Sequence, residues 1–551
     1  MRKMISRVAS AAACALLVTA CNSPLDVTNL NSADVARAYS TPANVESLVG
    51  QQYLQFHNAW MGSSDAIHVQ SHQLAFEGYA TVANFGMNIR AAIPRSPISN
   101  DRGNQSDAGN NREYSAFQRV SRTSSNLVQA LDRVMKANQT TGTLASDYRD
   151  RGFALMGIGL SLGYVALAYD SAAIVDHTVG SDVIPALSGY AAVGAKSLAL
   201  LDSALAWGGS STAAAAFPLP SGWVSTNSMS QADWVRFVRS QKARIRAGLA
   251  RDGTERAAVD WTSVIADATN GISANVVLQM GGSWSCAFDC SQMYVTGGWH
   301  EFPLPILGMA DTSGAYKTYI TTAVGGRDGA SVLIRTPDAR FPAGATRAAQ
   351  QAAAPVSGTA LPAGVYIGNR ASGDDFPGDG WGSSQYDHRR WLNIRAASGT
   401  GPMVVFAKAE NDMLAAEGYI RKGDLASAAT LINASRTLHG LPAISTPASA
   451  TASITGSFSA QGCVPQVPNA TSSNVACGSI LEAMKWEKRM ETAYTGFMSW
   501  YLDARGWNDL PEFTSQQWPI PNKEMDSRLK AFYNMGGSGG KFAAPKGTYG
   551  F

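Results

Sequence analysis

The stretch from Pro402 to Gly440 constrains the fold most, because it has the pattern of two short helices joined by a tight turn. Apolar side chains recur at roughly helical spacing in its first half, namely Phe406, Met413, Leu414 and Tyr419. Gly423 then suits the left-handed residue that ends a helix, and Asp424 can cap the next helix by accepting a backbone N–H. A second apolar series follows, namely Leu425, Ala428, Ala429 and Ile432. The stretch therefore predicts a helical hairpin, the unit of tetratricopeptide-type superhelices.

Helical patterns extend over most of the remaining chain. Thr41 caps the first of them, with Pro42 at the first helical position, where a missing N–H has no cost. The predicted helices cover 41–60, 114–136, 148–169, 190–207, 231–251 and 256–268, and a long helix follows Ser479 and buries Tyr494, Met498 and Tyr501. We therefore expect a mainly α fold, a superhelix of tetratricopeptide-like helical hairpins with irregular insertions made of loops and short strands.

These patterns divide the chain into regions. Residues 61–112 lack a sustained period, so we expect a long loop within the N-terminal helical repeats of 41–270. Residues 271–401 are rich in aromatic residues and glycine, and we expect short strands and ligand contacts there. Residues 402–551 hold the hairpin, the long helix and a Pro-Ile-Pro tail.

The N-terminus predicts export. In residues 1–20 a basic start precedes an apolar run that is too short to span a bilayer, which is typical of a signal peptide. The run ends in Leu17-Val18-Thr19-Ala20-Cys21, which resembles a bacterial lipobox. The resemblance implies cleavage before Cys21 and acylation of that residue, so that 21–40 form a lipidated tether to the membrane. The alternative is an ordinary signal peptide followed by a chance cysteine.

The mature chain is expected to carry no net charge. The formal charge of +3 includes Arg2, Lys3 and Arg7 of the signal, which contains no acid, so cleavage leaves a neutral protein. Charged residues make up 15% of the chain, against about 25% in an average globular protein. This composition argues against a nucleic-acid partner and suits neutral ligands that form hydrogen bonds.

Four cysteines remain after the signal and the lipidation site are set aside. An even number in an exported chain favours disulfides, and three pairings are possible. We favour the two local ones, Cys286–Cys290 and Cys463–Cys477. A four-cysteine zinc site is the alternative, although the C-x3-C and C-x13-C spacings fit it poorly.

Several motifs occur in an order that points to a family. They are Cys21-Asn22 and Leu25-Asp26-Val27 before the first helix, Ala415-Ala416-Glu417 and Gly423-Asp424 in the hairpin, Glu487-Lys488-Arg489-Met490-Glu491 in the long helix, and the terminal Pro519-Ile520-Pro521. Together they resemble the SusD/RagB-like nutrient-binding outer-membrane lipoproteins. The chain departs from that family at Thr495, Met498 and Tyr501, where a Glu, an Arg and an Asp are usual.

The resemblance implies a SusD-like fold and a lipid-anchored protein of the outer membrane that faces the cell exterior. It also implies the function of such proteins, which is to capture an oligosaccharide or a peptide and deliver it to a SusC-like TonB-dependent barrel. The alternative is a tetratricopeptide-type scaffold that binds another envelope protein and carries no nutrient.

Aromatic and polar side chains in the irregular regions are the candidate ligand contacts. An aromatic ring can lie against the apolar face of a sugar while neighbouring polar groups bond its hydroxyls. The candidate platforms are Trp284, Trp299 and Trp381, and the candidate polar partners are Asn84, Asp375 and Arg90. For each tryptophan the alternative is that it packs over the helical superhelix.

No reaction is expected. The chain has no H-E-x-x-H, G-x-S-x-G or P-loop signature. His68 and His72 could share a helical face as metal ligands, but no third ligand lies nearby in the sequence. Asp375 also lies in an Asp-rich turn that could bind calcium, although the spacing is not that of an EF-hand and a solvated turn explains it more simply. We therefore expect a binding protein without a cofactor.

Overall fold

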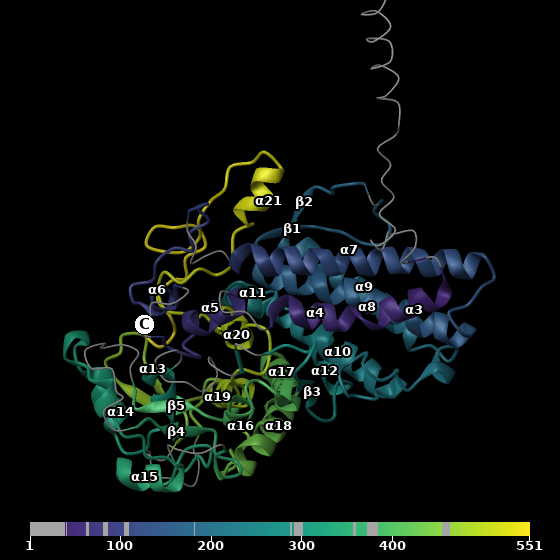
Figure 1. Ribbon diagram of the computed structural model, residues 1–551. Coiled ribbons are helices and arrows are strands. Elements are labelled where there is room, and N and C mark those ends of the chain that lie inside the picture. The colour runs from purple at the N-terminus through teal and green to yellow at the C-terminus, as the bar shows by residue number, and fades with distance from the viewer. Residues whose placement is uncertain are drawn as a thin grey trace, which may run out of the picture.

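The computed structural model describes most of the chain after the predicted signal peptide (Figure 1). The described residues are 39, 41–61, 66–80, 86–103, 109–180, 182–286, 289–290, 301–355, 360–371, 384–454 and 463–551. The signal, Cys21, and four of the candidate ligand residues, Asn84, Trp299, Asp375 and Trp381, lie outside them.

A superhelix of packed helices forms the frame, as the sequence predicts. Its main helices are α7 (Gly109–Lys136), α8 (Leu144–Ala168), α9 (Tyr190–Gly208), α10 (Gln231–Gly248), α12 (Trp261–Thr269), α17 (Lys408–Lys422), α18 (Leu425–Leu438) and α19 (Ile480–Thr492). Each packs against the next in this order, and α17 contacts both α18 and α19. The predicted helix over 256–268 is divided into α11 (Gly253–Ala257) and α12. The mainly α, tetratricopeptide-like architecture is confirmed.

The first predicted helix is also present, as the pair α3 (Pro42–Gly50) and α4 (Gln52–Trp60). Thr41 caps it by accepting the Asn44 N–H at 3.2 Å. The region 61–112, predicted as a loop, contains two short helices, α5 (Ile67–Leu74) and α6 (Met87–Ala91). Every residue of α5 is buried, so the helix has no polar face and its sequence shows no amphipathic period.

The hairpin at 402–440 forms α17 and α18, with two of its details as predicted. Gly423 has φ of 83° and ends α17, and the Asp424 side chain accepts the Ser427 N–H at 3.1 Å. The placement of Phe406 in the first helix is wrong. This residue ends strand β6 (Gly401–Phe406), which pairs with β3 (Val276–Met280) because its β-branched residues suit a buried strand.

The insertions consist of short helices and two-stranded antiparallel sheets. Besides β3 with β6, the pairs are β1 (Ser171–Ala173) with β2 (Leu187–Gly189), β4 (Ile367–Asn369) with β5 (Tyr386–His388), and β7 (Gln466–Pro468) with β8 (Val475–Cys477). The short helices are η3 (Ala214–Ala216), α13 (Leu304–Leu307), η5 (Gly308–Ala310), α14 (Ala315–Thr321), η6 (Val324–Gly326), η7 (Gly329–Ser331), α15 (Arg347–Ala353) and α16 (Leu392–Ala396).

The long C-terminal helix is predicted as continuous, and this is wrong. It is broken into α19 and α20 (Ser499–Gly506), and Tyr494 and Met498 in the break have positive φ of 58° and 56°. A short helix, α21 (Asn522–Ser527), follows the Pro-Ile-Pro segment.

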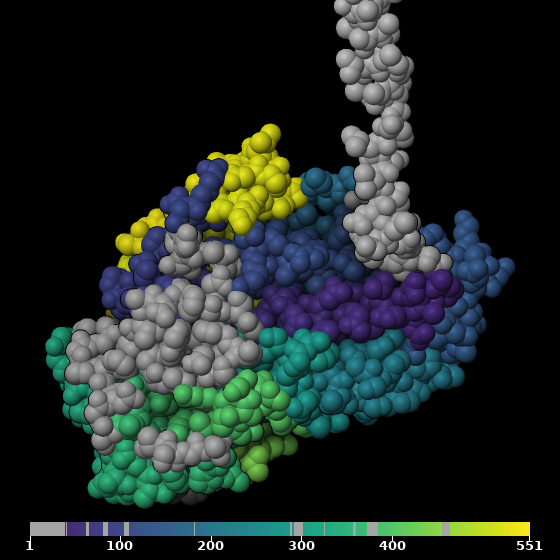
Figure 2. Space-filling view, viewed as in Figure 1, coloured from purple at the N-terminus to yellow at the C-terminus, as the bar shows by residue number. Residues whose placement is uncertain are grey.

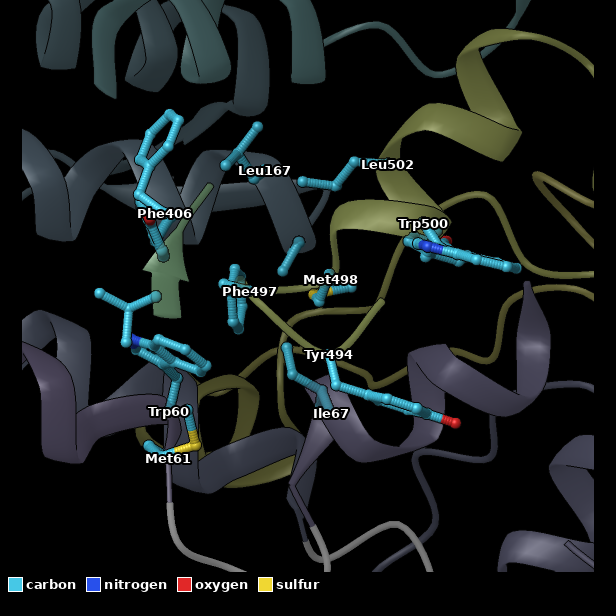
Figure 3. Packing of buried hydrophobic residues seen from close by; sticks show 14 of the residues in the cluster. Trp60, Met61, Ile67, Leu167, Phe406, Tyr494, Phe497, Met498, Trp500 and Leu502 are labelled. Carbon is cyan, nitrogen blue, oxygen red and sulfur yellow. The ribbon is translucent and has the colours of Figure 1, made fainter. Parts of the chain in front are cut away.

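The hydrophobic core joins elements that are far apart in the sequence. Trp60 of α4, Leu167 of α8, Phe406 of β6 and Phe497 of the α19–α20 break belong to one buried cluster (Figure 3). Helix α8 is long and apolar enough for a membrane span, but 94% of its most apolar window is buried in this core. It is therefore the central helix of the frame.

Both predicted disulfides are present. Cys286 pairs with Cys290 and Cys463 with Cys477, with Cα–Cα distances of 5.4 and 5.6 Å. These pairs leave no thiolate for the alternative zinc site.

Candidate functional site

Two segments that carry predicted ligand residues adjoin each other at one end. Asn84 belongs to 81–85 and Trp299 to 291–300, and the described residues beside these segments are joined directly. Tyr79 and Glu301 form an antiparallel bridge with two backbone hydrogen bonds of 2.9 Å each. The end of one segment therefore lies beside the start of the other.

The segment 372–383, which carries Asp375 and Trp381, starts and ends at the same place. The Ser384 N–H donates to Glu301 Oε2 at 3.4 Å, and the Ser384 hydroxyl donates to the Phe302 carbonyl at 2.6 Å. On the other side of the segment, the Arg370 N–H donates to the Gln385 carbonyl at 2.8 Å. We call Tyr79, Glu301, Arg370 and Ser384 the loop base.

A buried ion pair holds the loop base together. Arg370 Nη1 lies 3.5 Å from Glu301 Oε1 and 3.2 Å from Asp387 Oδ1, and both side chains of the Arg370–Glu301 pair are fully buried. Breaking a buried pair by removing one partner typically costs about 3–5 kcal/mol, because the other charge is left without its partner. The relative positions of the segment ends are therefore fixed by a strong interaction.

Tyr494 ties the loop base to the helical frame. Its N–H donates to Glu77 Oε1 at 2.7 Å and its hydroxyl donates to the Glu77 carbonyl at 2.9 Å. Glu77 also accepts from His72 Nδ1 of α5 at 2.5 Å. Since Glu77 is two residues from Tyr79, these contacts fix the base against α5 and the α19–α20 break.

Arg95 fixes the helices that flank the Asn84 segment. Its buried guanidinium donates to the Gln73 and Leu74 carbonyls at the end of α5, at 3.0 and 3.2 Å, and to the Ala91 carbonyl at the end of α6, at 2.7 Å. Burial lowers the pKa of Arg95 to about 9, and the side chain stays protonated at neutral pH. One cation therefore joins the C-terminal ends of both helices, where helix dipoles favour positive charge.

The candidate ligand residue Arg90 lies in α6, beside this joint. It is buried, its Nη1 donates to the Pro97 carbonyl at 3.0 Å, and burial lowers its pKa to about 10. The structure thus gives it a bond to the backbone, and direct contact with a ligand remains a prediction.

Trp284 follows β3 in a tight turn against helix α4. Its ring centroid lies 6.1 Å from that of Tyr53 and 5.4 Å from that of His57, and the side chain is partly buried. His57 Nε2 bonds the Ser285 carbonyl at 3.0 Å, and burial lowers the pKa of His57 to about 4, so the ring is neutral at physiological pH. One part of Trp284 packs on the frame, and its exposed part remains a candidate platform.

His68 and His72 both lie in α5. Among the described residues, no group of three or more His, Cys, Asp or Glu side chains is placed to hold a metal ion, so the two histidines have no third ligand there. His68 Nε2 lies 3.3 Å from Asp289 Oδ1, and both side chains are fully buried. Burial lowers the pKa of His68. The two histidines therefore connect α5 to the acidic residues Asp289 and Glu77.

The residues that build the loop base were not found from the sequence. Glu301, Arg370 and Glu77 are isolated charges next to aromatic or glycine-rich stretches, and no motif distinguishes them from surface charges. Their burial is the decisive property, and it depends on contacts between distant segments.

Similar proteins were found through the fold. No protein-family model and no curated protein sequence matches the chain. Among solved structures, it resembles a SusD superfamily protein from Bacteroides vulgatus, with a TM-score of 0.54 and 13% identity over 90% of this chain and 99% of that one. It also resembles a SusD-like protein from Bacteroides fragilis, with a TM-score of 0.52 and 11% identity over 91% and 98%. A SusD superfamily protein from Bacteroides thetaiotaomicron matches with a TM-score of 0.50 and 13% identity over 89% and 99%. The fold of this chain is the SusD fold.

Proposed function

We propose that this protein is a lipid-anchored protein of the outer membrane that captures a neutral oligosaccharide at the cell surface and delivers it to a SusC-like TonB-dependent transporter. The observation that carries the proposal is the loop base. On a SusD fold, the described residues before the Asn84 segment, after the Trp299 segment and on both sides of the segment with Asp375 and Trp381 meet around one buried ion pair, which favours a shared ligand for these segments.

The low charge of the chain supports a glycan as cargo. A neutral mature protein has little electrostatic attraction for charged polymers, whereas indole rings and amide or carboxylate groups match the C–H faces and hydroxyls of a sugar. A peptide is the other cargo to test, because the same groups can bond a peptide backbone.

Isothermal titration against panels of neutral oligosaccharides and of peptides tests the capture step. Trp299→Ala and Trp381→Ala should each weaken the best ligand at least about tenfold, which corresponds to about 1.4 kcal/mol. Trp207→Ala is the matched control, because the Trp207 ring packs against Tyr148 on the helical frame, with ring centroids 4.6 Å apart, and its loss should not affect affinity. Binding that both tryptophan variants retain in full contradicts a ligand site on these segments.

Purification of the tagged lipoprotein from native membranes tests the delivery step. We expect a large TonB-dependent barrel to co-purify with it. The alternative scaffold function is supported instead if no barrel is recovered and another envelope protein co-purifies. That partner should stay bound when Trp284, Trp299 and Trp381 are replaced by Ala.

A further inference from the structure

Large aliphatic side chains are exposed on two adjoining tips of the molecule. Val183 and Ile184, in the connection between β1 and β2, are 49% and 79% exposed, and Leu529, just after α21, is 95% exposed. The Arg528 Nη1 donates to the Pro185 carbonyl at 2.9 Å and joins the two tips. Figures 1 and 2 show α21 and the β1–β2 connection projecting together beyond α7.

Both tips are held in their exposed positions. Arg122 of α7 donates to the Val179, Gly180 and Val183 carbonyls at 3.2, 3.0 and 3.2 Å and so fixes the first tip on the helix. Leu529 has a positive φ of 55°, a conformation that costs a residue other than glycine about 1 kcal/mol or more. The turn after α21 therefore has a conformational cost, and the leucine at this position lies in solvent.

The chain that leads to the lipid anchor enters the structure beside these tips. The Tyr39 side chain lies beside Asn126 and Arg133 of α7. Asn126 is four residues from Arg122, which is about 6 Å along the helix axis. Only residues 22–38 separate Tyr39 from Cys21, the proposed lipidation site, so the length of this chain limits how far the α7 face can lie from the anchor.

The same face of α7 is basic. Residues 119, 122, 126, 129, 133 and 136 are spaced by three or four and share one side of the helix. Arg119 and Arg133 are exposed there and form no ion pair with another described residue, and Lys530 is exposed next to Leu529. Most neighbouring carboxylates already have a cation of their own, in the pairs Asp132–Arg151, Asp176–Lys196, Glu524–Arg528 and Asp526–Arg102. Asp101 and Asp182 are exposed and have no such pair with another described residue.

We propose that this surface contacts the lipid bilayer directly. Val183, Ile184 and Leu529 enter the headgroup region, while Arg119, Arg133 and Lys530 bind lipid phosphates. Protruding tips suit a deformable bilayer better than a protein partner, which would need a hollow of matching shape. An anchor attached at one residue leaves the protein free to rotate, and this second contact gives it one orientation on the membrane.

Vesicle flotation tests the proposal with the mature chain carrying Cys21→Ser, so that no acyl chain contributes. We expect binding to vesicles made of about two parts phosphatidylcholine to one part phosphatidylglycerol, and weaker binding to pure phosphatidylcholine. The double variant Ile184→Ser with Leu529→Ser should reduce the partition coefficient at least about tenfold. The double variant Arg119→Gln with Arg133→Gln should remove most of the preference for the anionic vesicles.

Leu438→Ser and Lys422→Gln are the matched controls. Leu438 is exposed on α18 and Lys422 on α17, and both helices lie far from α21 in Figure 1. Both should bind vesicles as the wild type does. Absence of binding to either vesicle, or full binding by the Ile184/Leu529 double variant, overturns the proposal. The proposal is also overturned if the wild type forms a dimer or a barrel complex that this double variant alone loses, because the face then binds a protein.

The result of the vesicle experiment does not depend on the result of the glycan titration. Oligosaccharide titration of the Ile184/Leu529 double variant should match the wild type, because the substitutions lie on the α7 face and not at the loop base. Loss of vesicle binding with glycan binding intact therefore concerns only the lipid contact.

Discussion

Replacement of Glu417 by Gln should destabilise the protein by about 3 kcal/mol in a manner that depends on pH. Glu417 of α17 lies at the junction of three helices, where Arg256 of α11 donates to its Oε1 and Oε2 at 3.0 and 2.5 Å. Arg256 Nη2 also lies 3.1 Å from Asp503 of α20, and the Trp507 indole donates to Glu417 at 3.1 Å. The Arg256–Glu417 pair is completely buried.

The magnitude follows from the pKa of Glu417. Burial alone would raise this pKa, but the charge and hydrogen bonds of Arg256 outweigh it and lower the pKa from 4.5 to about 2. One pKa unit corresponds to about 1.4 kcal/mol, so the native environment favours the charged carboxylate by roughly 3 kcal/mol. Because the folded-state pKa is depressed, this stability is fully present above about pH 4.5 and is lost as the pH falls towards 2.

Urea unfolding from pH 7 down to pH 3 measures the effect. The free-energy gap between the wild type and Glu417→Gln should be constant near neutral pH and should narrow below about pH 4.5. Glu512→Gln, at an exposed glutamate, is the control and should follow the wild type at every pH. The double variant Arg256→Met with Glu417→Met should be more stable than Glu417→Gln, since it removes both charges of the buried pair and Asp503 keeps Lys488 as its partner at 2.8 Å. A gap below about 1 kcal/mol at pH 7, or one that does not narrow in acid, refutes the reasoning.

Two further predictions concern the disulfide loop and the loop base. Replacing Cys463 and Cys477 by Ser opens a loop of 14 residues and should lower the unfolding free energy by about 3 kcal/mol. A reductant should then lower the unfolding free energy of this variant less than that of the wild type, because this disulfide is already absent. Glu301→Gln should weaken ligand affinity at least about tenfold in titration, because the ends of the three ligand segments lose their shared anchor. The control for the second variant is Glu524→Gln on α21, and equal affinity of Glu301→Gln and wild type would show that the loop base does not position the ligand contacts.

Local features of the fold were predictable from the sequence. The α17–α18 hairpin depends on Gly423 and Asp424, whose effects act within a single turn, and both disulfides close short loops. Helix α5 and the strand position of Phe406 were missed for the opposite reason. A fully buried helix has no amphipathic period, and strand β6 exists because it pairs with β3, which lies far away in the sequence.

The candidate site was predictable only in part, because its support comes from charges that are buried by tertiary contacts. Trp284 and Arg90 were chosen for their chemistry, and both turn out to have contacts with the frame or the backbone. Glu301 and Arg370 look like ordinary charged residues in the sequence, and only their pairing across the insertion places them beside the segments that carry the candidate ligand residues.

The break between α19 and α20 explains how the frame and the loop base depend on each other. In a continuous helix the Tyr494 N–H would donate to the carbonyl four residues earlier, at Met490, and could not reach Glu77. The break frees this N–H and points it at the Glu77 carboxylate at 2.7 Å, while the Tyr494 hydroxyl satisfies the Glu77 carbonyl. The left-handed conformation of Tyr494 costs about 1 kcal/mol or more, and two buried hydrogen bonds, one to a charged group, offset that cost. Met498 and Tyr501, which replace charged residues usual in the family that the sequence resembles, are buried and fill the space around the break.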